Sequence, residues 1–194
     1  MNQKQGVSTD RRIRKTKKAL RDGLTTLMLE KSLKDISVKE LTELVDINRG
    51  TFYLHYKDVF DMIEQIETEM LHDFTRVMSR HSTLNTNGLP LPLLTDIFIF
   101  LKENATMCAV LLSSNGDIAF VNKIKDIVRD KCISVWKELF GYSKVDNFEY
   151  FYSFILSGCI GLFESWLNKG LIEPPQQIAT LAQEMILYGI KVIR

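Results

Sequence analysis

The sequence predicts an all-α fold. Apolar residues recur at intervals of three and four along most of the 194 residues, which is the spacing of one face of a helix. No segment shows the strict alternation of apolar and polar residues that a half-buried strand requires. Clusters of glycine, proline, serine and asparagine interrupt the helical pattern and divide it into separate helices.

The composition is that of an ordinary globular protein, with 45% apolar and 25% charged residues. No stretch reaches the ~20 apolar residues that cross a bilayer, and the basic start leads into no apolar signal core. We therefore expect a cytoplasmic protein with no membrane partner. Cys108, Cys132 and Cys159 are widely spaced among apolar residues, which favours buried thiols over a disulfide frame or a metal site.

The charge is unevenly distributed along the chain. Residues 1–57 contain thirteen Lys or Arg and seven acids, a net charge of +6, whereas the whole chain carries +1. A basic segment on an acidic remainder indicates a local surface for a polyanion. An ordinary solvated face would show the same charges, so this feature does not decide the function by itself.

The first predicted helix covers residues 9–30, with Thr9 or Ser8 as its cap. Its apolar face consists of Ile13, Leu20, Leu24, Leu27 and Met28. The start of this helix also carries a basic group, which suits either a second phosphate contact or an arm in the minor groove, or simply solvation. The group consists of Arg11, Arg12, Arg14, Lys15, Lys17 and Lys18.

A second helix of about two turns is expected after Ser37. Ser37 and Glu40 form a capping box, in which the hydroxyl and the carboxylate each accept a hydrogen bond from a backbone N–H. Asp46 follows where a tight turn must lie, and aspartate tolerates a left-handed backbone. The inward residues are expected to be Leu41, Leu44 and Val45.

Asn48 is predicted to cap a third short helix over residues 49–55, with Phe52 and Tyr56 facing inward. Asp58 caps a fourth helix that runs to about Ser82. Its apolar positions are Phe60, Ile63, Ile66, Met70, Phe74 and Val77. After a linker over 83–92, further helices are predicted over 93–103, 105–113, 117–140, 146–168 and 175–193.

Two short helices joined by a tight turn and braced by a preceding helix form a helix-turn-helix. Its second helix must present a small, polar outer face to the major groove. Arg49 could pair with guanine, Gly50 lets the backbone approach closely, and the Thr51 methyl could meet a thymine methyl. Donors suited to phosphates are carried by Tyr53, His55 and Lys57. An aromatic core stripe beside a surface histidine is the alternative interpretation.

Residues 41–58, which end in Arg-Gly-Thr-Phe-Tyr-Leu-His-Tyr-Lys-Asp, resemble the DNA-binding signature of TetR/AcrR transcription regulators. Residues 111–117 and 157–170 are similar to the ligand-binding and dimerisation body of one TetR subgroup. The resemblance implies a homodimer that binds a palindromic operator in double-stranded DNA, commonly as a repressor. Its implied DNA-binding residues are Ser37, Asn48, Arg49, Gly50, Thr51, Tyr53, His55 and Lys57. Two residues depart from the pattern: Asp46 replaces the usual Gly, and Val59 replaces a frequent Lys.

We expect a helix-turn-helix domain over residues 1–57 and a helical regulatory and dimerisation domain over 58–194. The last two helices are the expected dimer interface, and closure of the monomer core is the alternative. The interface residues are Gly158, Gly161, Leu162, Trp166, Leu181, Met185 and Tyr188. A pocket for a small apolar ligand, or plain core, would be formed by Phe98, Leu101, Met107, Cys108, Leu111, Phe120, Trp136, Phe151 and Tyr152.

Rival functions have less support. No nucleophile elbow, phosphate-binding glycine loop or Cys–His signature is present, and the three histidines are scattered, so we expect neither an enzyme nor a cofactor or metal. A TetR-like coactivator or interaction module that needs a partner protein stays open as the alternative.

Overall fold

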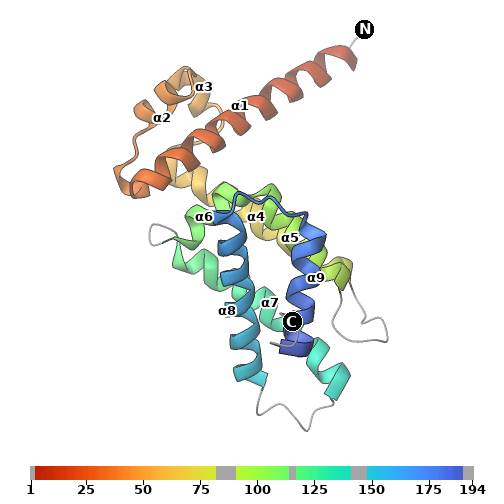
Figure 1. Ribbon diagram of the computed structural model, residues 1–194. Helices are drawn as coiled ribbons and strands as arrows, with labels where there is room; N and C mark the ends of the chain where they lie inside the picture. The colour runs from red at the N-terminus through yellow and green to blue at the C-terminus, as the bar shows by residue number, and fades with distance from the viewer. Residues whose placement is uncertain (1–2, 82–90, 114–116, 141–147, 190–194) are drawn as a thin grey trace. The chain divides into compact units, whose positions relative to one another are not determined.

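The structure is a computed structural model that describes residues 3–81, 91–113, 117–140 and 148–189. These residues form helices and turns, without strands, as Figure 1 shows. The chain divides into two compact units. One comprises Met1–Glu69 with Val110–Asp117, and the other Met70–Ala109 with Ile118–Arg194. The first unit thus extends beyond residue 57, and the functional boundary placed there stays a prediction.

The first unit contains the predicted succession of short helices. Its elements are α1 (Gln3–Glu30), a 3-10 turn (Leu33–Asp35), α2 (Val38–Leu44), α3 (Arg49–Tyr53) and the part of α4 (Val59–Arg80) up to Glu69. The prediction that α1 begins at Thr9 is wrong, because the helix continues through Ser8 and Thr9. A residue that can cap a helix does not end one when helix-compatible residues precede it.

The core of this unit is formed by one face of α1, of α3 and of α4. Its buried members include Leu20, Leu24, Leu27, Met28, Phe52, Tyr56, Met62, Ile63 and Ile66. The apolar face of α4 begins one residue earlier than predicted, because Val59 is buried and Phe60 is 54% exposed. Ile13 is also exposed, so the described core of α1 starts at Leu20.

The inward face of α2 differs from the prediction at one position. Leu41 is buried as expected, but Leu44 is 51% exposed and Thr42 is buried instead. The Thr42 hydroxyl donates to the carbonyl of Val38 at 2.8 Å, which satisfies its polar group inside the core. The buried side of α2 therefore includes a threonine that the apolar pattern did not predict.

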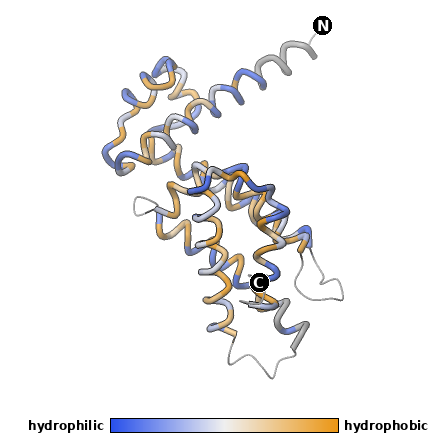
Figure 2. The backbone as a smooth tube through the Cα atoms, in the orientation of Figure 1, coloured by the Kyte–Doolittle hydropathy of each residue, from blue (hydrophilic) through white to orange (hydrophobic). Residues whose placement is uncertain are grey.

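The second unit is a helical bundle. It contains the rest of α4, α5 (Leu91–Glu103), most of α6 (Ala105–Leu112), α7 (Ile118–Phe140), α8 (Phe148–Asn168) and α9 (Pro175–Tyr188). Helix α5 lies along α9, and the ring of Phe98 on α5 meets Trp166 of α8 with centroids 6.0 Å apart. Figure 2 shows hydrophobic colouring along much of α5 and α8. Of the predicted α9, residues 190–193 lie outside the described residues.

The turn after α8 holds two residues in the left-handed region, Gly170 with φ 81° and Leu171 with φ 55°. The ammonium group of Lys102 donates to the carbonyl of Leu171 at 3.1 Å and lies 5.5 Å from the centre of the Trp166 ring. Lys102 thereby ties α5 to the turn between α8 and α9. Among the described residues, none of the helices has the length and apolarity that a membrane crossing requires.

Candidate nucleic-acid interface

The start of α2 is fixed by Ser37. Its hydroxyl accepts a hydrogen bond from the backbone N–H of Glu40 at 3.1 Å, as predicted. The Glu40 carboxylate accepts a hydrogen bond from the ammonium group of Lys31. Of the two hydrogen bonds of the predicted capping box, the structure shows the one that the serine accepts. The glutamate side chain instead links α2 to the end of α1.

The turn between α2 and α3 has the geometry that the sequence predicts. Asp46 adopts a left-handed backbone, with φ 52°. The N–H of Ile47 donates to the carbonyl of Thr42 at 2.9 Å and closes the turn. Asn48 then caps α3, since its side-chain oxygen accepts from the N–H of Gly50 at 2.7 Å. Together these contacts direct the chain from one short helix into the next.

Helix α3 has a buried side and an exposed side. Phe52 is fully buried, and its ring lies 5.6 Å from the also buried ring of Tyr56. Arg49, Gly50 and Tyr53 lie on the exposed side. The predicted DNA-binding residues therefore divide into two groups. Exposed are Ser37, Asn48, Arg49, Gly50, Tyr53 and Lys57, and half-buried are Thr51 and His55.

A carboxylate that the sequence interpretation overlooked lies between two of the cations near α3. The oxygen Oε1 of Glu43 is 3.8 Å from Nη2 of Arg49 and 4.0 Å from Nζ of Lys39. All three side chains are more than half exposed, and exposed pairs of this kind contribute about 0–1 kcal/mol. Arg49 can therefore leave Glu43 for a stronger partner at little cost.

The start of α4 is occupied by carboxylates. Asp58 accepts a hydrogen bond from the N–H of Asp61 at 2.8 Å. Asp61 in turn accepts from the N–H of Lys57 at 2.8 Å and from the amide of Gln65 at 3.1 Å. The bond from Lys57, more than any other contact, lowers the pKa of Asp61. A phosphate at this place would thus meet the exposed side chain of Lys57 rather than its backbone N–H.

Helix α1 contacts the segment after α3 and helix α4. The ammonium group of Lys17 lies 5.6 Å from the centre of the Tyr56 ring and 4.0 Å from the carboxylate of Glu69. Burial, followed by the charge of Glu69, raises the pKa of Tyr56. Lys17 therefore connects α1 to the end of the α3 segment and to α4.

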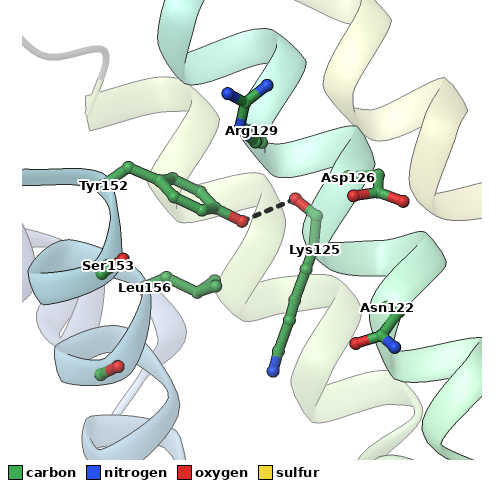
Figure 3. Close-up of a pocket in the computed structure, with 8 residues that line it drawn as sticks. Asn122, Lys125, Asp126, Arg129, Tyr152, Ser153 and Leu156 are labelled. Atoms are coloured by element: carbon green, nitrogen blue, oxygen red, sulfur yellow. Dashed lines mark hydrogen bonds between the residues drawn. The ribbon is translucent and has the colours of Figure 1, made fainter. Parts of the chain in front are cut away.

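The second unit contains a hollow of about 340 Å³ between α7 and α8 (Figure 3). The side chain of Tyr152 on α8 points toward α7, and its hydroxyl donates to the carbonyl of Lys125 at 2.7 Å. Arg129 forms an ion pair with Glu149 beside it. The hollow is lined by Asn122, Lys125, Asp126, Arg129, Tyr152, Ser153, Leu156 and Ser157.

One of the predicted pocket residues, Tyr152, lines this hollow. The others do not. Buried within the second unit are Phe98, Met107, Cys108 and Phe120, while Leu111 is buried in the first unit. Leu101 and Phe151 are half-buried, and the side chain of Trp136 lies outside those described. Burial raises the pKa of the Cys132 and Cys159 thiols to about 11, which agrees with unreactive thiols.

One side of α8 is open. A β-carbon added at Gly158 or at Gly161 would have no neighbour within 4 Å. Tyr150 and Phe154, which the sequence interpretation missed, are 79% and 74% exposed on the same helix. Trp166 lies instead in the core of the unit, 1% exposed, because its ring packs against Phe98. Of the other predicted interface residues, Met185 and Tyr188 are exposed, and Leu162 and Leu181 are half-buried.

Comparison with known proteins decides the family. The C-terminal region of TetR-type transcriptional regulators matches residues 90–188 of this chain. The chain belongs to the TetR family of transcriptional regulators. A TetR-family protein has the all-α architecture described above, with a helix-turn-helix unit and a helical body, and the predicted fold class is confirmed.

Relatives of this TetR-family chain are distant. The HTH-type transcriptional regulator YxbF of Bacillus subtilis (strain 168) is 21% identical over 86% of this chain and 43% of its own length. The chain thus spans less than half of that relative. The fatty acid degradation regulator FadR of Bacillus halodurans is 14% identical with a TM-score of 0.63, covering 90% of this chain and 96% of FadR. FadR of Bacillus subtilis, solved with stearoyl-CoA, is 15% identical with a TM-score of 0.61, covering 89% and 98%.

The two departures from the TetR pattern have different structural results. Asp46 adopts the left-handed turn that the usual glycine would adopt, so the turn is kept. Val59 is buried in the core of the first unit. A lysine at that position would have to turn its charge out of the core, so the valine contributes packing where other members have a cation.

Proposed function

We propose that this TetR-family protein is a repressor that binds a palindromic operator as a homodimer and leaves it when a small apolar ligand binds. The single observation that carries the proposal is the two-sided α3. Phe52 and Tyr56 anchor one side in the core, while Arg49, Gly50 and Tyr53 are exposed on the other. A helix held in this way can enter the major groove without disturbing the fold of its unit.

The roles of the outer residues follow from their chemistry. The guanidinium of Arg49 can make two hydrogen bonds to guanine, and Thr51 can contact a thymine methyl. Tyr53, His55 and Lys57 can donate to phosphates, which fix the position of α3 on the duplex. Ser37 and Asn48 hold the starts of α2 and α3 through their caps, next to the backbone of the DNA.

Dimerisation is supported by the open side of α8 and the exposed end of α9. Gly158 and Gly161 leave room for the close approach of another helix, and Tyr150 and Phe154 on the same helix, with Tyr188 on α9, offer exposed apolar surface. A two-fold dimer of this kind would place two α3 helices ~34–36 Å apart, the distance between successive major grooves on one side of a duplex.

For the ligand, the known complex of FadR with stearoyl-CoA suggests an acyl chain as the first class to test. A ligand that binds the DNA-incompetent conformation more tightly shifts the population away from the operator-bound dimer. We place the protein in the bacterial cytoplasm, where the DNA lies. Release of the protein from DNA by an acyl compound, but not by a matched polar compound, would support this part of the proposal.

The test is binding of the purified full chain to DNA from upstream of its own gene, compared with a scrambled duplex of equal length. Tyr53→Ala and Lys57→Ala are the test variants, and Lys169→Ala, an exposed lysine after α8, is the control. We expect selective binding that weakens steeply with salt, fails in both test variants and persists in the control. A folded dimer without selective binding would contradict the proposal and favour the partner-dependent coactivator.

A further inference from the structure

Glu43 is a carboxylate of α2 that lies beside the start of α3. Its oxygen Oε1 is 3.8 Å from Nη2 of Arg49 and 4.0 Å from Nζ of Lys39. Lys39 and Glu43 are one turn apart on the exposed side of α2, whose buried side includes Leu41 and Thr42. One negative charge is thus shared between two cations, one of which is the arginine at the start of the exposed side of α3.

The backbone keeps Glu43 next to Arg49. The N–H of Ile47 donates to the carbonyl of Thr42 at 2.9 Å and closes the turn between the two helices. Asn48 then caps the first turn of α3 through its side-chain oxygen. Figure 1 shows α2 and α3 as neighbouring short helices. Arg49 therefore meets any ligand of α3 with this carboxylate already beside it.

The distance between Glu43 and Arg49 is that of a charge attraction rather than of a hydrogen bond. Nitrogen and oxygen atoms in an N–H···O bond are about 2.7–3.2 Å apart, and this pair is separated by 3.8 Å. Glu43 therefore offsets the positive charge of the guanidinium without taking up one of its N–H donors. The charge and the donors of Arg49 are thus affected to different degrees.

The two partners that DNA offers to an arginine depend on these properties differently. A phosphate attracts the guanidinium mainly through charge, and every duplex presents phosphates. A guanine presents two neutral acceptors, O6 and N7, which the guanidinium recognises through directed hydrogen bonds. A neighbouring carboxylate therefore weakens the attraction to phosphates more than the recognition of guanine.

We propose that Glu43 is a specificity-determining residue, which weakens the binding of Arg49 to the phosphates of any duplex and spares its hydrogen bonds to a guanine of the operator. This inference rests on the proposed function, since it concerns the choice that Arg49 makes on the same DNA. Lys39 stays beside Glu43 when Arg49 turns to a base, so the carboxylate keeps a cation nearby. Specificity is a difference of affinities, and it rises when the affinity for the wrong partner falls.

The test variant is Glu43→Gln, which removes the charge and keeps the size and helix propensity of the side chain. Its control is Glu30→Gln, which removes the same charge from an exposed glutamate at the end of α1. Each full chain is titrated at several salt concentrations with DNA from upstream of its gene and with a scrambled duplex. We expect Glu43→Gln to bind the scrambled duplex about fivefold more tightly than Glu30→Gln does. Its affinity for the operator should change less, so the ratio of the two affinities falls.

The same titrations give a second readout. A guanidinium released from Glu43 becomes an additional partner for a phosphate of the scrambled duplex. The slope of log K against log salt on that duplex should therefore become steeper by about one per bound subunit in Glu43→Gln and stay unchanged in Glu30→Gln.

The Arg49→Ala background assigns the effect to its partner. Without a guanidinium beside it, Glu43→Gln should behave like Glu30→Gln on both duplexes, and the two mutations at positions 43 and 49 should be strongly non-additive. A difference between Glu43→Gln and Glu30→Gln that persists in Arg49→Ala would overturn the proposal, because the carboxylate would then act without Arg49.

Two further outcomes would overturn the role of Glu43. One is equal affinity of Glu43→Gln and Glu30→Gln for the scrambled duplex. The other is a loss of operator affinity confined to Glu43→Gln, which would show that the carboxylate itself accepts a hydrogen bond from a cytosine. Failure of the proposed function would look different, because the wild-type protein would then bind both duplexes equally while the scrambled duplex still tests Glu43. Absence of binding to any duplex would contradict both proposals.

Discussion

Gly23 of α1 lies so close to Val45, the residue that follows α2, that a β-carbon at Gly23 would overlap with Cγ1 of that valine. The same β-carbon would lie 3.1 Å from Cδ1 of Leu41. Valine is branched at Cβ and cannot easily turn its methyl group away. The absence of a side chain at Gly23 therefore sets how closely α2 can approach α1.

Gly23→Ala is expected to lower the free energy of unfolding by about 1–3 kcal/mol, because it overpacks this contact. Val45→Ala removes the methyl group that the new side chain would meet. The double variant should therefore be more stable than the sum of the two single effects predicts, as denaturant titration of all four proteins would show. Additive effects, or a Gly23→Ala protein as stable as wild type, would contradict the assignment.

Because Asp46 has a left-handed backbone, we expect two substitutions at this position to affect stability differently. Asp46→Gly should keep or raise stability, because glycine adopts this conformation without a steric penalty. Asp46→Ala should lower it by about 1 kcal/mol. Asp35→Ala, an exposed acid in the preceding turn, controls for the loss of charge. Thermal unfolding at equal protein concentration distinguishes them, and the same midpoint for Asp46→Gly and Asp46→Ala would refute the prediction.

Asn48 is expected to matter for α3 through its cap. Asn48→Ala leaves the N–H of Gly50 without its acceptor and should lower stability by about 1 kcal/mol. Asn48→Ser keeps an acceptor oxygen and is the matched control. Denaturation and DNA binding should be measured on the same preparations. If Asn48→Ser loses as much stability as Asn48→Ala, the cap is not the source of the effect.

The raised pKa of Tyr152 leads us to expect that the protein loses stability at high pH. Burial, followed by the charge of Cys132, raises the pKa of Tyr152 from 10.0 to about 12. Because the pKa is higher in the folded than in the unfolded chain, the contribution of this phenol to stability is complete below pH 10 and is lost between pH 10 and about 12.

Tyr152→Phe removes both the titration and the hydrogen bond to the carbonyl of Lys125. It should therefore be less stable than wild type at neutral pH, and the difference should shrink as the pH rises from 10 toward 12. Tyr150→Phe, on the exposed side of the same helix, should follow wild type throughout. Urea denaturation at several pH values checks this, and a constant difference between Tyr152→Phe and wild type would contradict it.

The proposed dimer can be tested at Gly161. Because nothing lies within 4 Å of a β-carbon there, Gly161→Leu should leave the helical content of the subunit unchanged. In a dimer built on this side of α8, the larger side chain should raise the dissociation constant by about tenfold or more. Lys169→Leu is the control. Sedimentation over a range of concentrations measures the dissociation constant of each variant. An unchanged dissociation constant for Gly161→Leu would show that this side of α8 is not part of the interface.

The helix-turn-helix could be predicted because its signals are local. Ser37, Asn48 and Asp58 cap the helices that the sequence assigned to them, and each cap involves residues two or three positions apart. The role of Gly23 could not be predicted in this way. Its partner Val45 lies 22 positions along the chain, just after α2, and no local pattern indicates which glycine faces which side chain.

The helical body was harder to predict at the level of single residues. An aromatic residue on an apolar helix has the same local pattern whether it faces the core or solvent, so Trp166 and Phe154 could not be distinguished. The pocket residues were chosen for their apolar character, whereas most of the side chains around the described hollow between α7 and α8 carry polar or charged groups. The body depends on contacts between distant segments, which the spacing of residues along one helix does not reveal.

The division of α3 into two sides has a consequence for altering the protein. Five residues are too few to keep a helix in isolation, so the shape of α3 depends on Phe52 and the neighbouring Tyr56 in the core. Arg49, Gly50 and Tyr53 lie on the exposed side and are not buried in that core. Under the proposed function, operator preference could therefore be redesigned by exchanging side chains on one side of a single short segment, while the other side keeps the fold intact.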